Sequence, residues 1–143
     1  MKRLFFFAIV LLSSTLCFAT PSEKVLKSFA SSFPKADSVN WYENENDYEV
    51  HFNMDKVQCR LWYDKEGTVI KSVRYYLQGM LPPIILSKVQ HKYTDKTIFG
   101  ITEVTTPEEG VQYFIVLQDE KKWYNVTSDS AGNLVLTKKF NKA

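Results

Sequence analysis

The sequence has few of the residues on which most catalytic and metal-binding sites depend. Among 143 residues there are two cysteines, two histidines and five glycines. Neither His51 nor His91 has a second ligand at the spacing that zinc sites use. No glycine-rich loop that could hold a phosphate is present. We therefore expect no catalytic residues, no metal and no cofactor, and predict that the protein is not an enzyme.

The sequence also lacks an apolar run of the roughly 20 residues that a transmembrane helix requires. Its apolar run, Leu4 to Leu12, follows Lys2 and Arg3 and precedes Cys17-Phe18-Ala19. This layout is typical of a secretory signal peptide over residues 1–19, with cleavage after Ala19. Lipid attachment at Cys17 is the alternative, but Leu16 stands where such a signal has a small residue. The pattern predicts a periplasmic or secreted protein with no integral membrane span.

After cleavage the chain has neither an excess of charge nor a possible disulfide. Loss of Lys2 and Arg3 leaves 18 minus 2, or 16, basic residues against 16 acidic ones. This balance gives no electrostatic argument for a nucleic-acid partner. Loss of Cys17 leaves Cys59 alone, so the fold of residues 20–143 must be held together by its core.

The mature chain contains the same pattern twice. The segment 48–67 aligns without a gap on 113–132. An apolar stripe with helical spacing precedes each copy. The first helix begins at Thr20-Pro21-Ser22-Glu23, which resembles a capping box with proline at the first helical position. The second begins at Pro82-Pro83. Each helix is followed by four segments with strand chemistry, at 38–43, 47–53, 56–63 and 68–77 and at 99–105, 111–118, 121–127 and 133–140.

Alternation within these strands indicates which face is buried. It places six residues of the first copy on one face, under the helices: Tyr48, Val50, Phe52, Cys59, Leu61 and Tyr63. We predict an α+β fold of two tandem helix-plus-four-strand pseudo-repeats, 20–77 and 81–143, forming an antiparallel sheet with the helices on one face.

Two acidic loops can be interpreted either as turns or as metal sites. Asp64 and Gly67 end one strand as Asp129 and Gly132 end its counterpart. An aspartate that opens a turn and a glycine in the left-handed conformation are ordinary hairpin chemistry. Calcium loops need several oxygen ligands at set spacing, and these loops offer too few. We interpret both as turns.

The sheet face without helices provides the candidate binding residues. Alternation places His51, Arg60 and Trp62 there, with Trp123 from the second copy and Arg74 and Tyr76 as possible neighbours. Tryptophan, tyrosine and arginine dominate protein interfaces. Whether Arg60, Trp62 and Trp123 bind a partner or are covered stays open. For Phe114 and Val116, on the same face, we favour packing against the other copy, loops or a second subunit. Cys59 points to the opposite face from His51, so the two cannot form a catalytic pair.

Several short motifs, in order, resemble the beta-lactamase-inhibitor-like, PepSY-like family of exported bacterial proteins. They are Phe33-Pro34, Ala36, Val39, Trp41, Tyr48-Glu49-Val50-His51-Phe52, Tyr63-Asp64, Gly67, Leu81-Pro82, Lys92-Tyr93 and Tyr113-Phe114-Ile115-Val116-Leu117. The resemblance implies two tandem helix-plus-sheet units, export, and a role in binding or inhibiting another protein. Thr94 and the segment 127–129 depart from the family pattern.

Together these observations predict an exported, non-enzymatic binding or inhibitor module. It would bind an unidentified protein or peptide through the helix-free face of its sheet. The alternative is a structural or envelope-associated protein that self-associates through that face. The sequence indicates neither the partner nor the oligomeric state.

Overall fold

A computed structural model describes residues 20–143 as one eight-stranded antiparallel sheet with two α-helices. The predicted signal peptide, residues 1–19, lies outside the described residues. The sheet confirms the α+β class, and each predicted strand matches an observed one to within two residues at either end. The elements are α1 (Glu23–Ser32), β1 (Asp37–Glu43), β2 (Asp47–Met54), β3 (Val57–Asp64), β4 (Val69–Tyr76), the 3-10 turn η1 (Gln78–Met80), α2 (Pro83–Lys92), β5 (Thr97–Thr106), β6 (Gly110–Gln118), β7 (Lys122–Asp129) and β8 (Leu134–Asn141).

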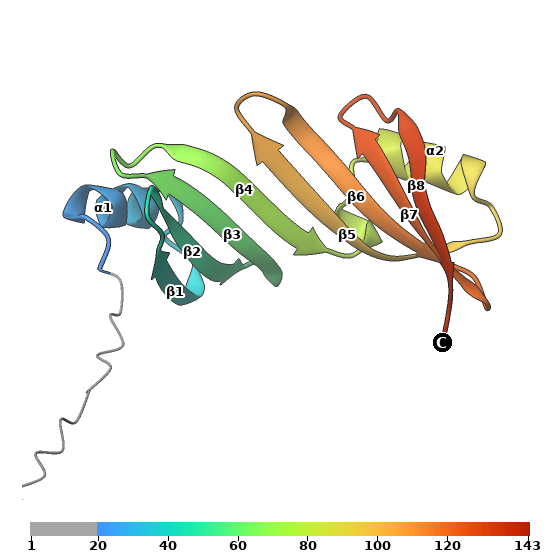
Figure 1. The fold of residues 1–143 in the computed structure, drawn as a ribbon, viewed down its shortest axis with the longest axis horizontal. Helices are drawn as coiled ribbons and strands as arrows, with labels where there is room; N and C mark the ends of the chain where they lie inside the picture. Colours follow the sequence, from blue (N-terminus) through green and yellow to red (C-terminus); the bar gives the residue numbers. More distant parts are fainter. Residues whose placement is uncertain (1–19) are drawn as a thin grey trace, which may run out of the picture.

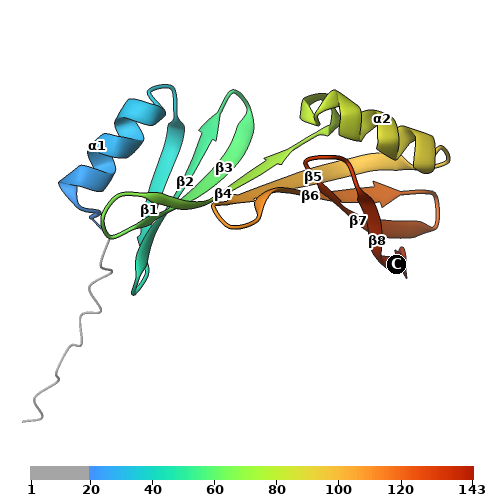
Figure 2. The ribbon, with the colours of Figure 1, turned by 90° about the horizontal axis from the view of Figure 1, so that it is seen from above.

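Strand order in the sheet follows the order of the chain, from β1 at one edge to β8 at the other (Figure 1). Both helices lie on the same side of the sheet, α1 over the first strands and α2 over the last (Figure 2). The halves meet where Ser72–Tyr76 of β4 pairs with Ile101–Thr105 of β5. Helix and four strands thus occur twice in the chain, while the proposal that the halves are pseudo-repeats stays a prediction.

The two helices begin in different ways. Ser22 caps α1, because its Oγ accepts a hydrogen bond of 3.4 Å from the backbone N–H of Val25. The predicted cap at Thr20, with Pro21 at the first helical position, is therefore wrong by two residues. In α2, Pro83 occupies the first helical position, where its missing N–H costs nothing, as the sequence predicts.

The hydrophobic core lies between the sheet and the helices. Val25 and Phe29 of α1 and Ile85 and Val89 of α2 are buried against it. All six strand residues predicted for this face are buried: Tyr48, Val50, Phe52, Cys59, Leu61 and Tyr63. The second half contributes Ile101, Tyr113, Ile115, Leu117, Tyr124 and Val126 to the same cluster. Neither helix of residues 20–143 is long and apolar enough to cross a membrane.

The two aspartate-glycine loops are hairpin turns, as predicted. Gly67 and Gly132 have φ values of 90° and 80°. The backbone N–H of each glycine donates to the carbonyl of the aspartate three residues earlier, at 3.1 Å in both turns. The carboxylates are occupied by the loops themselves, since Asp64 Oδ1 accepts from the N–H of Thr68 and Asp129 Oδ1 from that of Asn133.

Replacing Gly132 by valine should destabilise the protein more than the same change at Gly67. Both positions have positive φ, which costs a β-branched residue about 1–2 kcal/mol. At Gly132 a Cβ atom would also lie 2.8 Å from Lys88 Cδ, and moving this side chain would break its hydrogen bond of 2.8 Å to the Ala131 carbonyl. At Gly67, by contrast, the nearest atom is 3.6 Å away. Urea unfolding measures the difference, with Gly79→Val as the control because no neighbour lies within 4 Å. Equal losses at all three positions, or a melting temperature raised by calcium, would contradict the turn interpretation.

Candidate binding surface

Strand register places most of the predicted binding residues on the helix-free face. Residues directly opposite each other in an antiparallel pair point to the same side. His51 is paired with Arg60, and Trp62 lies between Glu49 and Lys71. The alternate residues of these strands are in the core, so these side chains point away from the helices. The same logic places Phe114, Val116, Trp123 and Asn125 on that face in the second half.

Arg74 and Tyr76 lie on the other face, so their predicted placement is wrong. Arg74 is paired with the buried Cys59, and Tyr76 with the buried Ile101. The physical reason is a register shift in the β3–β4 ladder between Trp62 and Tyr63. A one-residue shift moves every following side chain to the opposite face. Apolar residues of β4 stand at both odd and even positions, so alternation along this strand could not reveal the shift.

On the helix side these two residues form a polar network around Glu103. Arg74 Nη1 lies 3.3 Å from Glu103 Oε1, and the Tyr76 hydroxyl donates to Glu103 Oε2 at 2.7 Å. Burial, reinforced by the bond to this carboxylate, raises the pKa of Tyr76. The network links β4 to β5, the one strand pair that joins the two halves. Its position indicates a structural role in holding the halves together.

The fold does not bring together the cysteine and the histidines, the residue types considered for catalysis. Burial raises the pKa of the Cys59 thiol, although Arg74 opposes the shift. A buried thiol with a raised pKa is a poor nucleophile. His51 lies on the opposite face, and His91 is exposed on α2, as the sequence predicts. Within residues 20–143 no group of three or more histidine, cysteine, aspartate or glutamate residues could hold a metal ion.

In the first half of the helix-free face, aromatic and charged side chains contact one another across four strands. The rings of Tyr42 and His51 have centroids 4.6 Å apart, and His51 Nε2 is hydrogen-bonded to Glu49 Oε1. The Arg60 guanidinium lies 5.5 Å from the centre of the Tyr75 ring. Lys71 Nζ lies 4.7 Å from the centre of the Trp62 ring. Lys71, Tyr42 and Tyr75 are members of this surface that the sequence reasoning did not identify.

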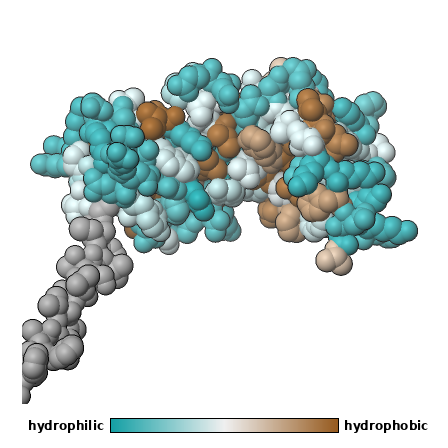
Figure 3. All heavy atoms as spheres, in the orientation of Figure 1, coloured by the Kyte–Doolittle hydropathy of each residue, from teal (hydrophilic) through white to brown (hydrophobic). Residues whose placement is uncertain are grey.

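In the second half of the same face, large hydrophobic side chains are exposed. Phe99, Phe114, Val135 and Phe140 are between 42% and 57% exposed. Trp123 lies among them, with its ring 4.8 Å from that of Phe99 and in edge contact with it. Figure 3, in the orientation of Figure 1 with α2 behind the sheet, shows hydrophobic atoms between the hydrophilic ones over the centre and right of the molecule. Phe114 is therefore not covered by the other copy or by loops of residues 20–143, while packing against a second subunit stays a prediction.

Alternation along β5 does not predict that Phe99 lies on this face, because Phe99 is part of a bulge. The β5–β6 ladder shifts register between Ile98 and Gly100, and Phe99 is the residue skipped. Phe140 is on this face because it is paired with Trp123. A second bulge, in the β7–β8 ladder, lies between Phe140 and the start of β8, so simple alternation along that strand does not place it. The only local sign of the bulge is that Phe99 stands near the start of a strand, directly before a glycine.

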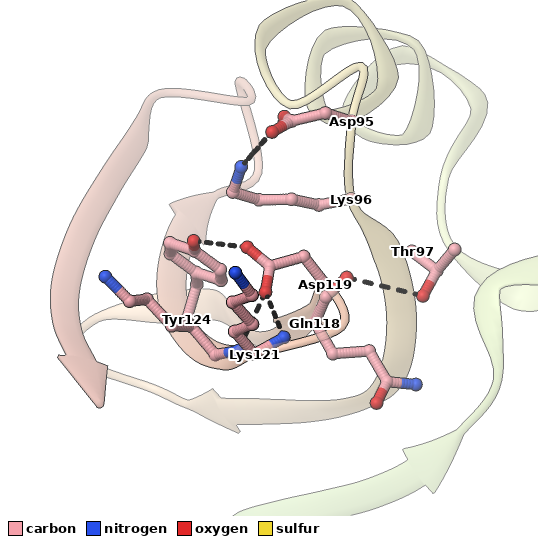
Figure 4. A network of polar contacts seen from close by, with 8 residues as sticks. Asp95, Lys96, Thr97, Gln118, Asp119, Lys121 and Tyr124 are labelled. Atoms are coloured by element: carbon pink, nitrogen blue, oxygen red, sulfur yellow. Dashed lines mark hydrogen bonds and ion pairs between the residues drawn. The ribbon is translucent and has the colours of Figure 1, made fainter. Parts of the chain in front are cut away.

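A separate polar network surrounds the β6–β7 hairpin (Figure 4). Asp119 accepts hydrogen bonds from the backbone N–H groups of Lys121 and Lys122, at 2.8 and 2.7 Å, and from the Tyr124 hydroxyl at 2.6 Å. The Tyr124 bond, followed by the backbone bonds, lowers the pKa of Asp119 to about 2. Lys96 Nζ lies 4.6 Å from the centre of the Tyr124 ring. The carboxylate is occupied by its own hairpin, which indicates a structural role.

This network predicts a component of stability that depends on pH. The Asp119 carboxyl has a lower pKa in the folded protein than its ordinary value of 3.8, so it stabilises the fold above about pH 4. That contribution should be lost as the pH falls from about 4 through about 2. Asp119→Asn should melt at a lower temperature at pH 7 and show a shallower loss between pH 4 and 2, measured by circular dichroism. Identical pH profiles for the two proteins would contradict this role.

Comparison with known proteins gives a match at the level of structure alone. No family model matches the sequence, and no curated protein matches it. A solved BLIP-like protein from Bacteroides fragilis superimposes with a TM-score of 0.66 and 15% identity, covering 87% of this chain and 89% of that one. The chain has the fold of this BLIP-like protein.

Two further solved structures share the fold. A DUF2874 family protein from Bacteroides ovatus gives a TM-score of 0.64 and 20% identity, over 86% of this chain and 89% of that one. A candidate periplasmic protein from Bacteroides eggerthii gives a TM-score of 0.64 and 15% identity, over 86% and 90%. These matches support the resemblance drawn from the motifs, since proteins described as BLIP-like and as periplasmic share the architecture seen here.

Proposed function

We propose that residues 20–143 form an exported binding module that holds another protein or a peptide against the helix-free face of its sheet. The observation that carries this proposal is the exposure of three aromatic residues on that face, since Phe99, Phe114 and Phe140 are each at least 42% exposed. Exposed apolar patches of this kind mark interaction sites in soluble proteins. The fold shared with a BLIP-like protein supports a binding or inhibitory role.

The composition of the face also supports a protein or peptide partner. Trp62, Trp123 and Arg60 are the residue types that contribute most to protein interfaces. Arg60 and Trp62 lie beside charged and aromatic side chains, and Trp123 lies beside the exposed Phe99. Export to the periplasm or beyond is part of the proposal and follows from the signal-like segment 1–19 and from the candidate periplasmic protein that shares the fold.

Self-association through the same face is the second candidate, because an exposed apolar patch can also be covered by a second copy. Ultracentrifugation over a range of concentrations separates the two candidates. A monomer at all concentrations favours a foreign partner. A dimer that dissociates when Phe114 is replaced by aspartate favours self-association.

Replacing Phe114 by aspartate should abolish capture of the partner while the protein stays folded. The change places a charge at an exposed aromatic position of the helix-free face, where it would be desolvated on binding. The matched control is Ile84→Asp, at a residue of α2 that is 57% exposed. The two proteins and the wild type would be immobilised and exposed to the periplasmic fraction of the source cell, and bound proteins identified by mass spectrometry. Capture that survives Phe114→Asp, or is lost equally with Ile84→Asp, would contradict the proposed function.

A further inference from the structure

A polar hollow of about 290 Å³ opens on the helix-free face of the first four strands. Six of its lining residues belong to that face by strand register. His51 is opposite both Asn40 and Arg60, and Gln58 is opposite both Asn53 and Tyr75. The hollow therefore lies within the proposed binding surface, yet its lining is polar, in contrast with the exposed aromatic residues of the second half.

The guanidinium of Arg60 has unused hydrogen-bond donors in this hollow. It carries five N–H groups, and none makes a hydrogen bond to another residue of 20–143 within the described structure. Its nearest acid is Glu49, with 3.9 Å between Nη1 and Oε1. The side chain is 43% exposed, and the Tyr75 ring lies beneath the guanidinium. This cation–π contact favours one placement of the guanidinium, while its N–H groups stay free for a second group.

Glu49 forms an ion pair with Arg60 at 3.9 Å but makes no hydrogen bond to it. Its Oε1 is hydrogen-bonded to His51 Nε2, and its side chain is only 19% exposed. Among the described residues, the Gln58 amide and the Tyr75 hydroxyl also make no side-chain hydrogen bond. The hollow thus presents one guanidinium, one amide and one hydroxyl with unused donors. These groups match a carboxylate, which an arginine can bind through two parallel hydrogen bonds.

We propose that this hollow receives the carboxylate of an acidic side chain of the partner, with Arg60 as its main ligand and Gln58 and Tyr75 as additional donors. The inference rests on the proposed function and adds to it the chemistry of the partner. It predicts that the partner presents an aspartate or glutamate to the first half of the face and apolar side chains to the second half.

The test is an NMR titration of the nitrogen-15-labelled protein with N-acetyl-glutamic acid N-methylamide, whose carboxylate is that of a side chain. We expect saturable shifts of the Arg60 Nε–H and the Gln58 amide. The neutral probe, N-acetyl-glutamine N-methylamide, should produce none. Equal responses to the two probes would overturn the proposal, as would shifts confined to residues outside the hollow. Tighter binding of N-acetyl-alanine, which has a chain-terminal carboxylate, would overturn the assignment to a side chain.

Two substitutions should change the affinity for the acidic probe in opposite directions. Arg60→Gln should weaken binding by at least about tenfold, because it removes a charge-assisted pair. Glu49→Gln should tighten binding by about threefold, because it removes a like charge beside the guanidinium. Lys27→Gln, at an exposed residue of α1 and with the same loss of charge as Arg60→Gln, should have no effect. Unchanged affinity in Arg60→Gln, or weaker binding in Glu49→Gln, would overturn the proposal.

These results separate the hollow from the broader function. If Phe114→Asp abolishes partner capture but Arg60→Gln leaves both capture and the probe titration unchanged, the face binds a partner and the carboxylate hollow is wrong. If capture survives Phe114→Asp, the proposed function fails whatever the probe shows.

Discussion

The protein carrying Phe52→Ala should lose about 3–5 kcal/mol of its free energy of unfolding, the largest effect we expect from one substitution. Phe52 is 4% exposed. Its ring lies 5.0 Å from that of Phe29, in edge contact, and 5.2 Å from that of Phe33. The change would leave a cavity between β2 and α1, the helix that covers this half of the sheet. Urea unfolding followed by fluorescence measures the loss.

Phe114→Ala is the matched control for Phe52→Ala. The substitution is the same, but Phe114 is 45% exposed on the other face of the sheet. It should cost clearly less than Phe52→Ala, because nearly half of the Phe114 side chain is exposed and its loss leaves no closed cavity. Comparable losses at the two positions would show that the helix-free face is a second core.

Trp62→Ala and Trp123→Ala should each weaken partner binding by about 30-fold, or about 2 kcal/mol, the size expected of interface hot spots. Each tryptophan is partly exposed, and each has a lysine over its ring, Lys71 at 4.7 Å and Lys142 at 4.7 Å. Removing either ring leaves the core between sheet and helices intact, so unfolding should stay close to that of the wild type.

Binding isotherms and melts recorded on the same preparations separate the two effects. Ile84→Ala, at an exposed residue of α2, is the control for loss of a surface side chain. If Trp62→Ala and Trp123→Ala unfold the protein as readily as Phe52→Ala does, these residues support the fold and the proposed site is lost.

The strands could be predicted because local signals define them. Asp64 and Gly67 close one hairpin and Asp129 and Gly132 another, and strict alternation in β2 and β3 distinguishes Val50 from His51. Local sequence also explains the error at the first helix. Thr20 and Ser22 are both suitable caps, and the choice of Ser22 depends on where Val25 packs in the core.

The binding surface was less predictable because it depends on pairing between strands. Arg74 and Tyr76 were misplaced by the register shift beside Trp62, and Phe99 lies in a bulge. Neither irregularity has a strong local signature, because a bulge is a property of two strands together. The exposure of Phe114 likewise depends on whether a distant segment covers it. Alternation identifies the face but not what lies over it.

The central claim is that the partner binds the helix-free face, and hydroxyl-radical footprinting of the complex tests it most directly. Oxidation of exposed side chains would be compared by mass spectrometry in the free protein and in the complex with the captured partner. We predict that Trp62, Phe114, Trp123 and Phe140 become protected, while Ile84 and His91 on α2 are oxidised as before. Protection of the α2 residues, with unchanged oxidation of the two tryptophans, would contradict the account.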